Sequence, residues 1–323
     1  MSHAIVVHQP GGPEVLKWEQ VPIDAPGQGQ VKLRHTAVGL NYIDVYHRTG
    51  YYPMKTPFTP GMEAAGVVEA VGEGVTDLQA GDRVAYAMVI GGYAEERLVA
   101  ADRLVKLPDP IDERTAAAMM LQGMTARYLV RDVFPIKGGE TILVHAAAGG
   151  VGLILCQWAA SLGATVIGTV SSEEKAALAR THGCHYPIIY TRDDFVTKLL
   201  EITGGKKLPV VFDSVGKDTF MKSLDCLRPR GLMVTYGQSS GAVPPLDLAI
   251  LAQKGSLQVT RTGLATFIAT EDRLRESAGD LFEMVGSGKI KITINQTYPL
   301  KDVAQAHRDL EARKTTGSTV LTV

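Results

Sequence analysis

The sequence has few cysteines, few aromatic residues and no excess of charge of either sign. Only three cysteines occur among 323 residues, and their odd number and wide spacing (Cys156, Cys184 and Cys226) do not make a disulfide framework. A reducing compartment such as the cytoplasm suits such a chain. Lysine plus arginine number 33 and aspartate plus glutamate 34, so the net charge is −1. This balance gives no electrostatic footprint for nucleic acid or for an acidic membrane surface.

Long hydrophobic runs are also absent. No stretch of about 18 or more uncharged apolar residues occurs, so no membrane span is expected. The first residues, MSHAIVVHQPGG, lack the apolar region and cleavage site of a signal peptide. Hydrophobic residues make up 45% of the chain and charged residues 21%, which is typical of a globular protein. The length exceeds the usual ~100–200 residues of one domain, so two domains are expected.

The first 120 or so residues are rich in short β-branched runs separated by glycine and proline clusters. This pattern predicts a compact β barrel or sandwich. Asp112 is then the predicted N-cap of an alanine- and methionine-rich helix, and a second helix is expected over 125–133. The predicted strands of this part lie at 5–7, 31–38, 65–71, 83–87 and 95–99.

Strands and helices alternate from residue 141 onward, which predicts right-handed crossovers and a parallel sheet covered on both faces. One helix is expected to open with a capping box in which Ser171 caps and Glu174 lies three residues later. The tail predicts a helix at 271–286, a strand at 289–294, a helix at 301–313 and a strand at 319–323. The strands of the alternating part are expected at 141–145, 165–170, 186–190, 210–213, 232–236 and 257–260, with helices at 151–162, 171–183, 193–203 and 218–227.

Residues 145–152, HAAAGGVG, lie between an apolar strand and an apolar helix. They form a dinucleotide-binding fingerprint with one departure, because Ala147 stands where the first glycine is usual. Gly149 would let the backbone approach a pyrophosphate, and Gly152 would allow close helix–strand packing. The N–H groups at the helix start, on Gly150 and Val151, would hold the phosphate charge. The alternative is a plain tight turn.

The residues after the second strand of this unit indicate the type of dinucleotide. An NAD enzyme usually has an acid there for the ribose 2′-hydroxyl, and positions 168–172 contain none. Ser171, Ser172 and Lys175 could instead bind a 2′-phosphate, although Lys175 also fits an exposed helix lysine. We therefore expect NADPH to be preferred over NADH.

Motifs spread over the whole chain carry a family resemblance: GLNYIDVYHRTGYYP (39–53), GMEAAGVVEAVGEGV (61–75), AGDRVAY (80–86), HAAAGGVG (145–152), GTVSSEEK (168–175), FDSVG (212–216), YGQSSG (236–241), PLKDVAQAH (299–307) and EARKTTGS (311–318). Together they resemble the zeta-crystallin-type NADPH:quinone oxidoreductases, which are zinc-free members of the medium-chain dehydrogenase/reductase superfamily. The resemblance implies an α/β fold in which a GroES-like β domain, at 1–124 and 263–323, receives an inserted Rossmann doubly wound parallel-sheet domain at 125–262. It also implies a homodimer.

The resemblance further implies which residues contact the cofactor. It places Ser171, Lys175, Tyr190 and Arg313 around the adenosine 2′-phosphate, and Asn41, Thr125 and Tyr128 near the nicotinamide. It places Ser214, Gly237, Ser240 and Arg261 along the cofactor. Tyr190 has a warrant of its own, because an aromatic ring at a strand end can stack on adenine.

No metal site is expected. Zinc dehydrogenases of this superfamily need three protein ligands and an open position. Their ligand positions are here Asn41, Met62 and Leu121, whose side chains bind zinc poorly or not at all. NADPH would therefore carry the redox chemistry, and the protein would supply orientation and shape.

The proposed catalytic residues are Asn41, as a hydrogen-bond donor to a substrate carbonyl, and Tyr46 and Tyr52, which could stack on a flat ring. For both tyrosines, packing of a loop against the domain core is the alternative. The expected activity is reduction of quinones by NADPH. Two alternatives stay open: reduction of activated C=C bonds in enals or enones, and a nucleotide-binding structural or RNA-binding role. The sequence does not decide the exact quinone, the number of electrons per step or an essential proton donor.

Overall fold

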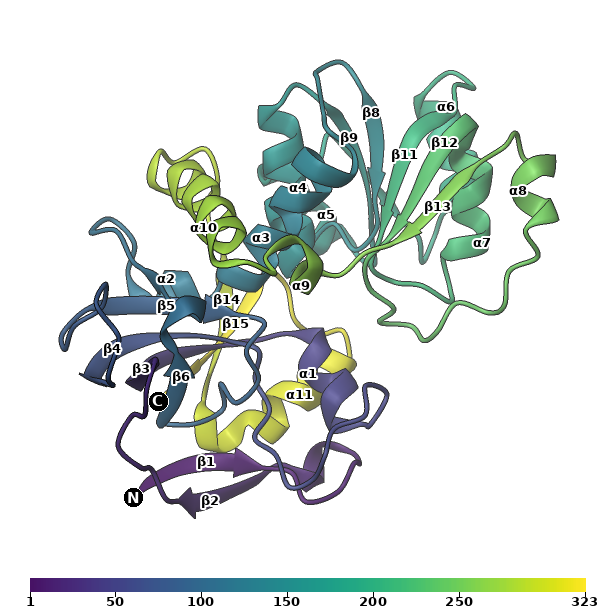
Figure 1. Cartoon of the computed structure of the whole chain (residues 1–323). Helices are drawn as coiled ribbons and strands as arrows, with labels where there is room; N and C mark the ends of the chain where they lie inside the picture. Colours follow the sequence, from purple (N-terminus) through teal and green to yellow (C-terminus); the bar gives the residue numbers. More distant parts are fainter. The chain divides into compact units, whose positions relative to one another are not determined.

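The computed structural model describes all 323 residues and divides into two compact units. The first unit consists of residues 1–124, 268–286 and 292–323, and the second of residues 125–267 and 287–291. Both chain termini therefore belong to the first unit, where the purple and yellow segments lie together in Figure 1.

A seven-stranded sheet organises the first unit, with strand order β14-β15-β3-β4-β5-β7 and β6 paired to β3. The central strand β3 is long, and its alternating burial reflects one face packed on the core (Figure 1). The C-terminal strand β15 pairs antiparallel with β3, which ties the tail to the N-terminal part. The strands are β1 (Ser2–Val6), β2 (Lys17–Val21), β3 (Gln30–Leu40), β4 (Glu63–Val71), β5 (Arg83–Ala87), β6 (Glu96–Ala100), β7 (Val105–Lys106), β14 (Ile294–Pro299) and β15 (Ser318–Thr322).

Helices of different lengths accompany this sheet. α1 was not among the predicted elements, because seven residues are too few to show a helical period. α2 begins after Asp112, whose side chain accepts a hydrogen bond from the N–H of Thr115 at 2.6 Å, so this predicted cap is confirmed. The helices are α1 (Tyr42–Arg48), α2 (Glu113–Ala117), α10 (Glu271–Gly286) and α11 (Val303–Glu311), while α3 (Met120–Tyr128) runs from the first unit into the second.

The second unit is a six-stranded parallel sheet with strand order β10-β9-β8-β11-β12-β13. Numbered within the unit, this is the order 3-2-1-4-5-6 of the doubly wound dinucleotide-binding fold, so the predicted fold class is confirmed. Helices α4 and α5 cover one face and α6 and α7 the other (Figure 1). The strands are β8 (Thr141–Val144), β9 (Thr165–Val170), β10 (Tyr186–Ile189), β11 (Leu208–Asp213), β12 (Leu227–Thr235) and β13 (Gln258–Arg261); the helices are α4 (Gly150–Ser161), α5 (Glu173–Thr181), α6 (Phe195–Ile202), α7 (Phe220–Ser223), α8 (Ala249–Gln253) and α9 (Leu264–Phe267).

Some local predictions were wrong. The N-cap of α5 is Ser172, not Ser171, because Ser172 has the extended backbone and its Oγ accepts from the N–H of Lys175 at 3.3 Å. The strand expected at 289–294 is instead β14, which begins at Ile294 and pairs with β15. Residues before it cannot join a ladder there, because the Gln157 amide binds both the N–H and the carbonyl of Lys291, at 2.8 and 3.0 Å.

Helix lengths also differ from those expected. The helix predicted at 125–133 begins earlier, at Met120, and its last turn, Leu129–Val133, is a π-helix. The helix predicted at 218–227 is reduced to α7 and one 3-10 turn, Leu224–Cys226. None of the helices has both the length and the apolar character needed to cross a membrane.

Candidate cofactor and active site

The predicted phosphate loop joins β8 to α4 at the carboxyl end of the parallel sheet. Gly149 is the N-cap of α4, so Gly150, Val151 and Gly152 form the first helical turn. The N–H groups of a first turn have no partner within their helix and carry its positive dipole end. A Cβ on Gly152 would lie 2.2 Å from the carbonyl oxygen of Ala146, so only glycine fits there. This strand–turn–helix has the features that a pyrophosphate site requires.

Ala147, which replaces the first glycine of the fingerprint, is accommodated by a glycine elsewhere. A Cβ on Gly168 of β9 would lie 2.6 Å from the Cβ of Ala147 and 2.6 Å from Sγ of Cys184. The missing Cβ of Gly168 therefore makes room for the methyl group of Ala147. The loop can keep the fingerprint geometry because the residue that lacks a side chain is Gly168 on the neighbouring strand β9.

The predicted 2′-phosphate residues of this unit lie together at the carboxyl ends of β9 and β10. The N–H of Tyr190 donates to the carbonyl of Val170 at 3.0 Å, next to Ser171, and the Tyr190 side chain is exposed. Lys175 lies in the first turn of α5. Arg313, in contrast, belongs to the first unit, where it follows α11.

Two acids near this end are engaged by neighbours. The carboxylate of Glu173 pairs with Arg192 at 2.9 Å, and a hydrogen bond with Ser172 lowers the pKa of Glu174. Both carboxylates therefore have structural partners. Arg192 was not among the predicted site residues, because a lone arginine after a strand has no distinguishing pattern.

The remaining loops at this end of the sheet converge. A Cβ on Gly237 would lie 2.7 Å from the carbonyl oxygen of Ser214, and the hydroxyl of Ser240 donates to the carbonyl of Val215 at 2.8 Å. The structure thus brings Ser214, Gly237 and Ser240 together after β11 and β12. Arg261 is the last residue of β13.

Tyr128 and Thr125 are buried at the start of the second unit. The ring of Tyr128 stacks on Phe267 with centroids 4.2 Å apart, and its hydroxyl lies 3.2 Å from Oγ1 of Thr262. Burial raises the pKa of Tyr128 to about 12, so this hydroxyl stays protonated. The structure gives Tyr128 a packing role, and its predicted place near the nicotinamide stays a prediction.

In the first unit, Asn41 is the N-cap of α1 and has a buried side chain. Its Nδ2 lies 2.7 Å from Oε2 of Glu63, and its Oδ1 lies 3.2 Å from Nε2 of Gln122. Its backbone N–H donates to Oδ2 of Asp44 at 2.9 Å. Asn41 is therefore held by three neighbours from α1, β4 and α3.

The three positions where zinc enzymes carry ligands meet at Glu63. This residue follows Met62 directly, contacts the side chain of Asn41, and accepts the N–H of Leu121 at 2.8 Å through Oε1. No group of three or more histidine, cysteine, aspartate or glutamate side chains with the geometry of a metal site occurs in the structure. The donor set of an amide, a thioether and an alkyl chain does not suit zinc.

Burial is the largest influence on the pKa of the two acids next to Asn41, which are Glu63 and Asp44. Burial raises the pKa of Glu63 to about 8, against hydrogen bonds from Asn41 and the Leu121 N–H that lower it. Burial likewise raises the pKa of Asp44 to about 7. Sequence reasoning missed Glu63 as a site residue, although it stands in the Gly61–Met62–Glu63 stretch used to dismiss zinc.

A second buried chain of polar groups starts at Asp44. The hydroxyl of Tyr93 donates to Asp44 at 2.8 Å and lies 3.1 Å from Nε2 of His307. Nδ1 of His307 lies 3.1 Å from Arg48, which pairs bidentately with Glu311 at 2.8 and 2.9 Å. Burial lowers the pKa of His307 to about 3, so this histidine is neutral. The chain ties α1 to α11.

The predicted catalytic tyrosines form one aromatic cluster at the end of α1. The rings of Tyr46 and Tyr52 lie 5.2 Å apart in an edge-on arrangement, and Tyr46 also contacts Tyr42 and Tyr51 at 5.3 and 5.6 Å. Tyr51 is half exposed. The structure thus brings Tyr46 and Tyr52 together, as both the stacking and the packing interpretations require.

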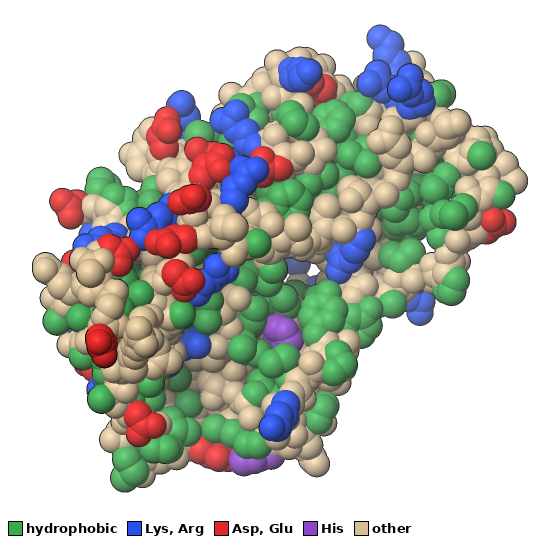
Figure 2. All heavy atoms as spheres, in the orientation of Figure 1, with side chains coloured by type: hydrophobic (Ala, Val, Ile, Leu, Met, Phe, Trp, Pro, Cys, Tyr) green, Lys and Arg blue, Asp and Glu red, His purple; other side chains and the backbone are tan.

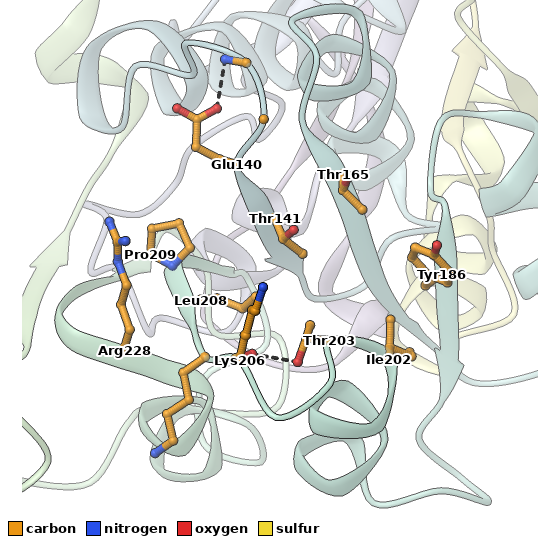
Figure 3. Close-up of a pocket in the computed structure, with 13 residues that line it drawn as sticks. Glu140, Thr141, Thr165, Tyr186, Ile202, Thr203, Lys206, Leu208, Pro209 and Arg228 are labelled. Atoms are coloured by element: carbon orange, nitrogen blue, oxygen red, sulfur yellow. Dashed lines mark hydrogen bonds between the residues drawn. The ribbon is translucent and has the colours of Figure 1, made fainter.

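A separate cavity of about 610 Å³ lies at the amino ends of the parallel strands, away from the phosphate loop. Figure 3 shows Tyr186 at one end of this cavity and Arg228 at the other. Its cations, Lys206, Lys207 and Arg228, are exposed, and the oxygens of Glu140 accept backbone N–H groups of its own loop at 2.8 and 3.1 Å. Ligands of such sheets bind at the carboxyl ends, so we assign this cavity no part in the site.

A dinucleotide fold combined with a GroES-like sheet defines a medium-chain dehydrogenase/reductase. Comparison with known proteins agrees. The family described as "Alcohol dehydrogenase GroES-like domain" matches residues 27–109, and the one described as "Zinc-binding dehydrogenase" matches residues 182–321. The second description names zinc, but the ligand positions here are Asn41, Met62 and Leu121.

Individual relatives cover almost the whole chain. A quinone oxidoreductase from Pseudomonas aeruginosa is 52% identical over 96% of each chain. A 2-haloacrylate reductase from a Burkholderia species is 46% identical over 99% of each chain. The crystal structure of Escherichia coli quinone oxidoreductase complexed with NADPH superimposes with a TM-score of 0.98 at 48% identity, covering 99% of this chain and 100% of that one. The chain belongs to the quinone oxidoreductase family, as the sequence motifs predicted.

Proposed function

We propose that this protein reduces quinones with NADPH and without zinc. The observation that carries the proposal is the phosphate loop at Gly149–Gly152, followed by Ser171, Lys175 and Tyr190 with no free acid beside them. When bound there, NADPH supplies the hydride. A relative at 52% identity is a quinone oxidoreductase, and a structure with NADPH bound has the same fold.

The chain's own residues bind and orient the cofactor and exclude water from it. The α4 N-terminus holds the pyrophosphate, and Ser171, Lys175 and Tyr190 hold the adenosine end, with Arg313 as a further contact. Ser214, Gly237, Ser240 and Arg261 border the cofactor, and Thr125 and Tyr128 lie near its nicotinamide. The assignments at the loops after β8, β9, β10, β11 and β12 rest on the gathering of these loops at the carboxyl ends of the sheet. Those of Thr125, Tyr128 and Arg313 rest on the family resemblance.

Asn41 donates a hydrogen bond to a substrate oxygen, where negative charge develops during reduction. Tyr46 and Tyr52 present aromatic faces to a flat ring. A quinone needs no strong acid, because its reduced oxygens take protons from water.

The decisive assay measures NADPH oxidation with simple quinones, enones, enals and aldehydes, with NADH as the comparison cofactor. The proposal predicts turnover of quinones with NADPH. Absence of quinone turnover, together with turnover of another class, would contradict it.

Reduction of activated C=C bonds is the second candidate function. It is favoured by the 46% identity to a 2-haloacrylate reductase over nearly the whole chain. The same metal-free cluster could hold an enone carbonyl against Asn41. Higher kcat/KM for enones or haloacrylates than for quinones would decide for this alternative.

A structural or RNA-binding role has less support. Acidic and basic side chains lie interspersed over the first unit on the face shown in Figure 2. Lys32, for example, pairs with Glu69 at 3.0 Å and with Glu96 at 3.1 Å. Measuring RNA affinity with and without NADPH tests this role directly.

The proposed assembly is a homodimer joined through β13. This strand is at the edge of the six-stranded sheet, and its Val259 is exposed. Pairing with the same strand of a second copy would cover both edges. Light scattering at micromolar concentration tests this, since a mass near 34.6 kDa would indicate a monomer. The three free cysteines suit the cytoplasm, which fractionation of expressing cells tests.

A further inference from the structure

A chain of hydrogen bonds runs from Glu63 through Asn41 and Gln122 to Ser318. The distances are 2.7 Å between Glu63 Oε2 and the Asn41 amide, 3.2 Å between the two amides, and 2.7 Å between Gln122 and Oγ of Ser318. Oγ of Ser318 also lies 2.7 Å from the carbonyl oxygen of Ala118. All five groups belong to the first unit.

The direction of this chain follows from counting hydrogens at Ser318. A hydroxyl has one hydrogen, whereas the carbonyl oxygen of Ala118 can only accept. The hydroxyl of Ser318 must therefore donate to Ala118, because two acceptors 2.7 Å apart without a hydrogen would repel. Gln122 must then donate to Ser318 through its Nε2, since the single hydroxyl hydrogen is already used.

The orientation of the Gln122 amide in turn fixes the orientation of the Asn41 amide. An amide that gives its nitrogen to Ser318 turns its oxygen towards Asn41, so Asn41 must donate to Gln122 through Nδ2. The oxygen and nitrogen of an amide exchange places by a half-turn that leaves the distances almost unchanged. Oδ1 of Asn41 then faces Oε2 of Glu63 at 2.7 Å, the usual length of an O–H···O bond.

We propose that Glu63 is held as a neutral carboxylic acid that donates its proton to Oδ1 of Asn41, and that it is a positioning residue for Asn41. The chain then runs from Glu63 to Asn41, Gln122, Ser318 and the Ala118 carbonyl, with one donor and one acceptor at each link. The inference rests on the proposed role of Asn41 as donor to a substrate oxygen.

The surroundings of Glu63 agree with a neutral acid. Its Oε1 accepts the N–H of Leu121, the backbone of Met120 also donates to the carboxyl group, and Oε2 is the oxygen that lies against Asn41. The titratable groups that face it are Asp44 on α1 and Tyr86 on β5, and no cationic side chain contributes to its charge balance. Burial raises the pKa of Glu63 above neutrality.

A neutral Glu63 helps the proposed reaction in two ways. A carboxylate one hydrogen bond from Asn41 would repel the negative charge that develops on the substrate oxygen, whereas the acid does not. Donation into Oδ1 of Asn41 also polarises the amide and strengthens its remaining N–H as a donor.

The test compares the unmodified enzyme with Glu63→Gln. The glutamine reproduces the neutral acid, because its oxygen can accept from Leu121 and its nitrogen can donate to Asn41. We expect kcat with quinone to stay within about threefold and the NADPH dissociation constant to stay unchanged. The direct readout is infrared difference spectroscopy at pH 7, in which Glu63→Gln loses one protonated-carboxyl band that the unmodified protein shows. Glu69→Gln, which replaces a half-buried and ion-paired carboxylate on the same strand, should remove no such band.

Each outcome decides a separate question. If no protonated-carboxyl band disappears in Glu63→Gln, or if its kcat falls tenfold or more, the neutral acid is refuted. Glu63→Ala tests the positioning role: it should lower kcat about tenfold, and that loss should vanish when the same change is made in Asn41→Ala. A loss that persists there refutes positioning. If Asn41→Ala alone leaves quinone turnover unchanged, the proposed function of Asn41 fails, whatever the spectra show.

Discussion

The methyl group of Ala147 occupies space that Gly168 leaves open, since a Cβ on Gly168 would lie 2.6 Å from the Cβ of Ala147. Ala147 lies in the phosphate loop and Gly168 lies on β9, and the two residues are in direct contact. The dinucleotide fingerprint therefore depends on a pair of positions that are distant in sequence.

Replacing Gly168 with alanine should distort the phosphate loop. We expect a loss of about 1–3 kcal/mol in stability, the range for an overpacked core, and weaker NADPH binding. Adding Ala147→Gly should recover part of both losses, but contact with Cys184 prevents full recovery. Thermal unfolding and NADPH titration of the single and double variants measure this. Equal behaviour of the single and double variants would contradict the pairing.

Replacing Lys175 with alanine should weaken NADPH binding by roughly 1–3 kcal/mol, the contribution of a charge-assisted contact to the 2′-phosphate, and barely change NADH binding. Lys206→Ala is the matched control, because this lysine lies at the opposite end of the sheet. Fluorescence titration with both cofactors measures the effect. Equal affinity of the unmodified protein for NADPH and NADH would refute the NADPH assignment.

The free energy of unfolding should fall as pH rises from about 5 to 9. Burial raises the pKa of Glu63 to about 8 and that of Asp44 to about 7 in the folded protein. A carboxyl with a raised folded pKa stabilises the fold most below its unfolded pKa, and this contribution is lost as pH rises through the folded value. Urea unfolding at several pH values measures the total fall in the free energy of unfolding, which Glu63→Gln should make smaller by a few kcal/mol, at about 1.4 kcal/mol per pKa unit. An unchanged fall in Glu63→Gln would be the contrary result.

Activity should not depend on zinc. The side chains of Asn41, Met62 and Leu121 stand at the three ligand positions, and the oxygens of Glu63 are engaged by Asn41 and the Leu121 N–H. The purified enzyme is therefore expected to contain no stoichiometric zinc and to keep its activity in chelator. Elemental analysis and assays with chelator check this, and activity that is lost with chelator and restored by zinc would show the expectation to be wrong.

Local sequence patterns were enough to predict the elements of the second unit that we assign to cofactor binding. The phosphate loop, the absence of an acid after β9 and the alternation of strands and helices all lie within short windows of sequence. The site in the first unit was harder to predict from the sequence. Asn41 was named from the family resemblance, and Tyr46 and Tyr52 from their aromatic character, whereas Gln122 and Ser318 carry no motif. Arg48 and His307, which are far apart in the sequence, form a buried contact. No motif near either residue predicts that contact.

The amino-acid sequence alone indicated an organisation in two units, the glycines that the phosphate loop needs and the family to which the chain belongs, because these depend on neighbouring residues and on motifs along the chain. Only the tertiary structure decided which side chains meet. Glu63, Asn41, Gln122 and Ser318 come from β4, the start of α1, α3 and β15, and they contact one another because sheet pairing brings β15 beside β3. Burial at that junction, which no local pattern encodes, sets the protonation of Glu63.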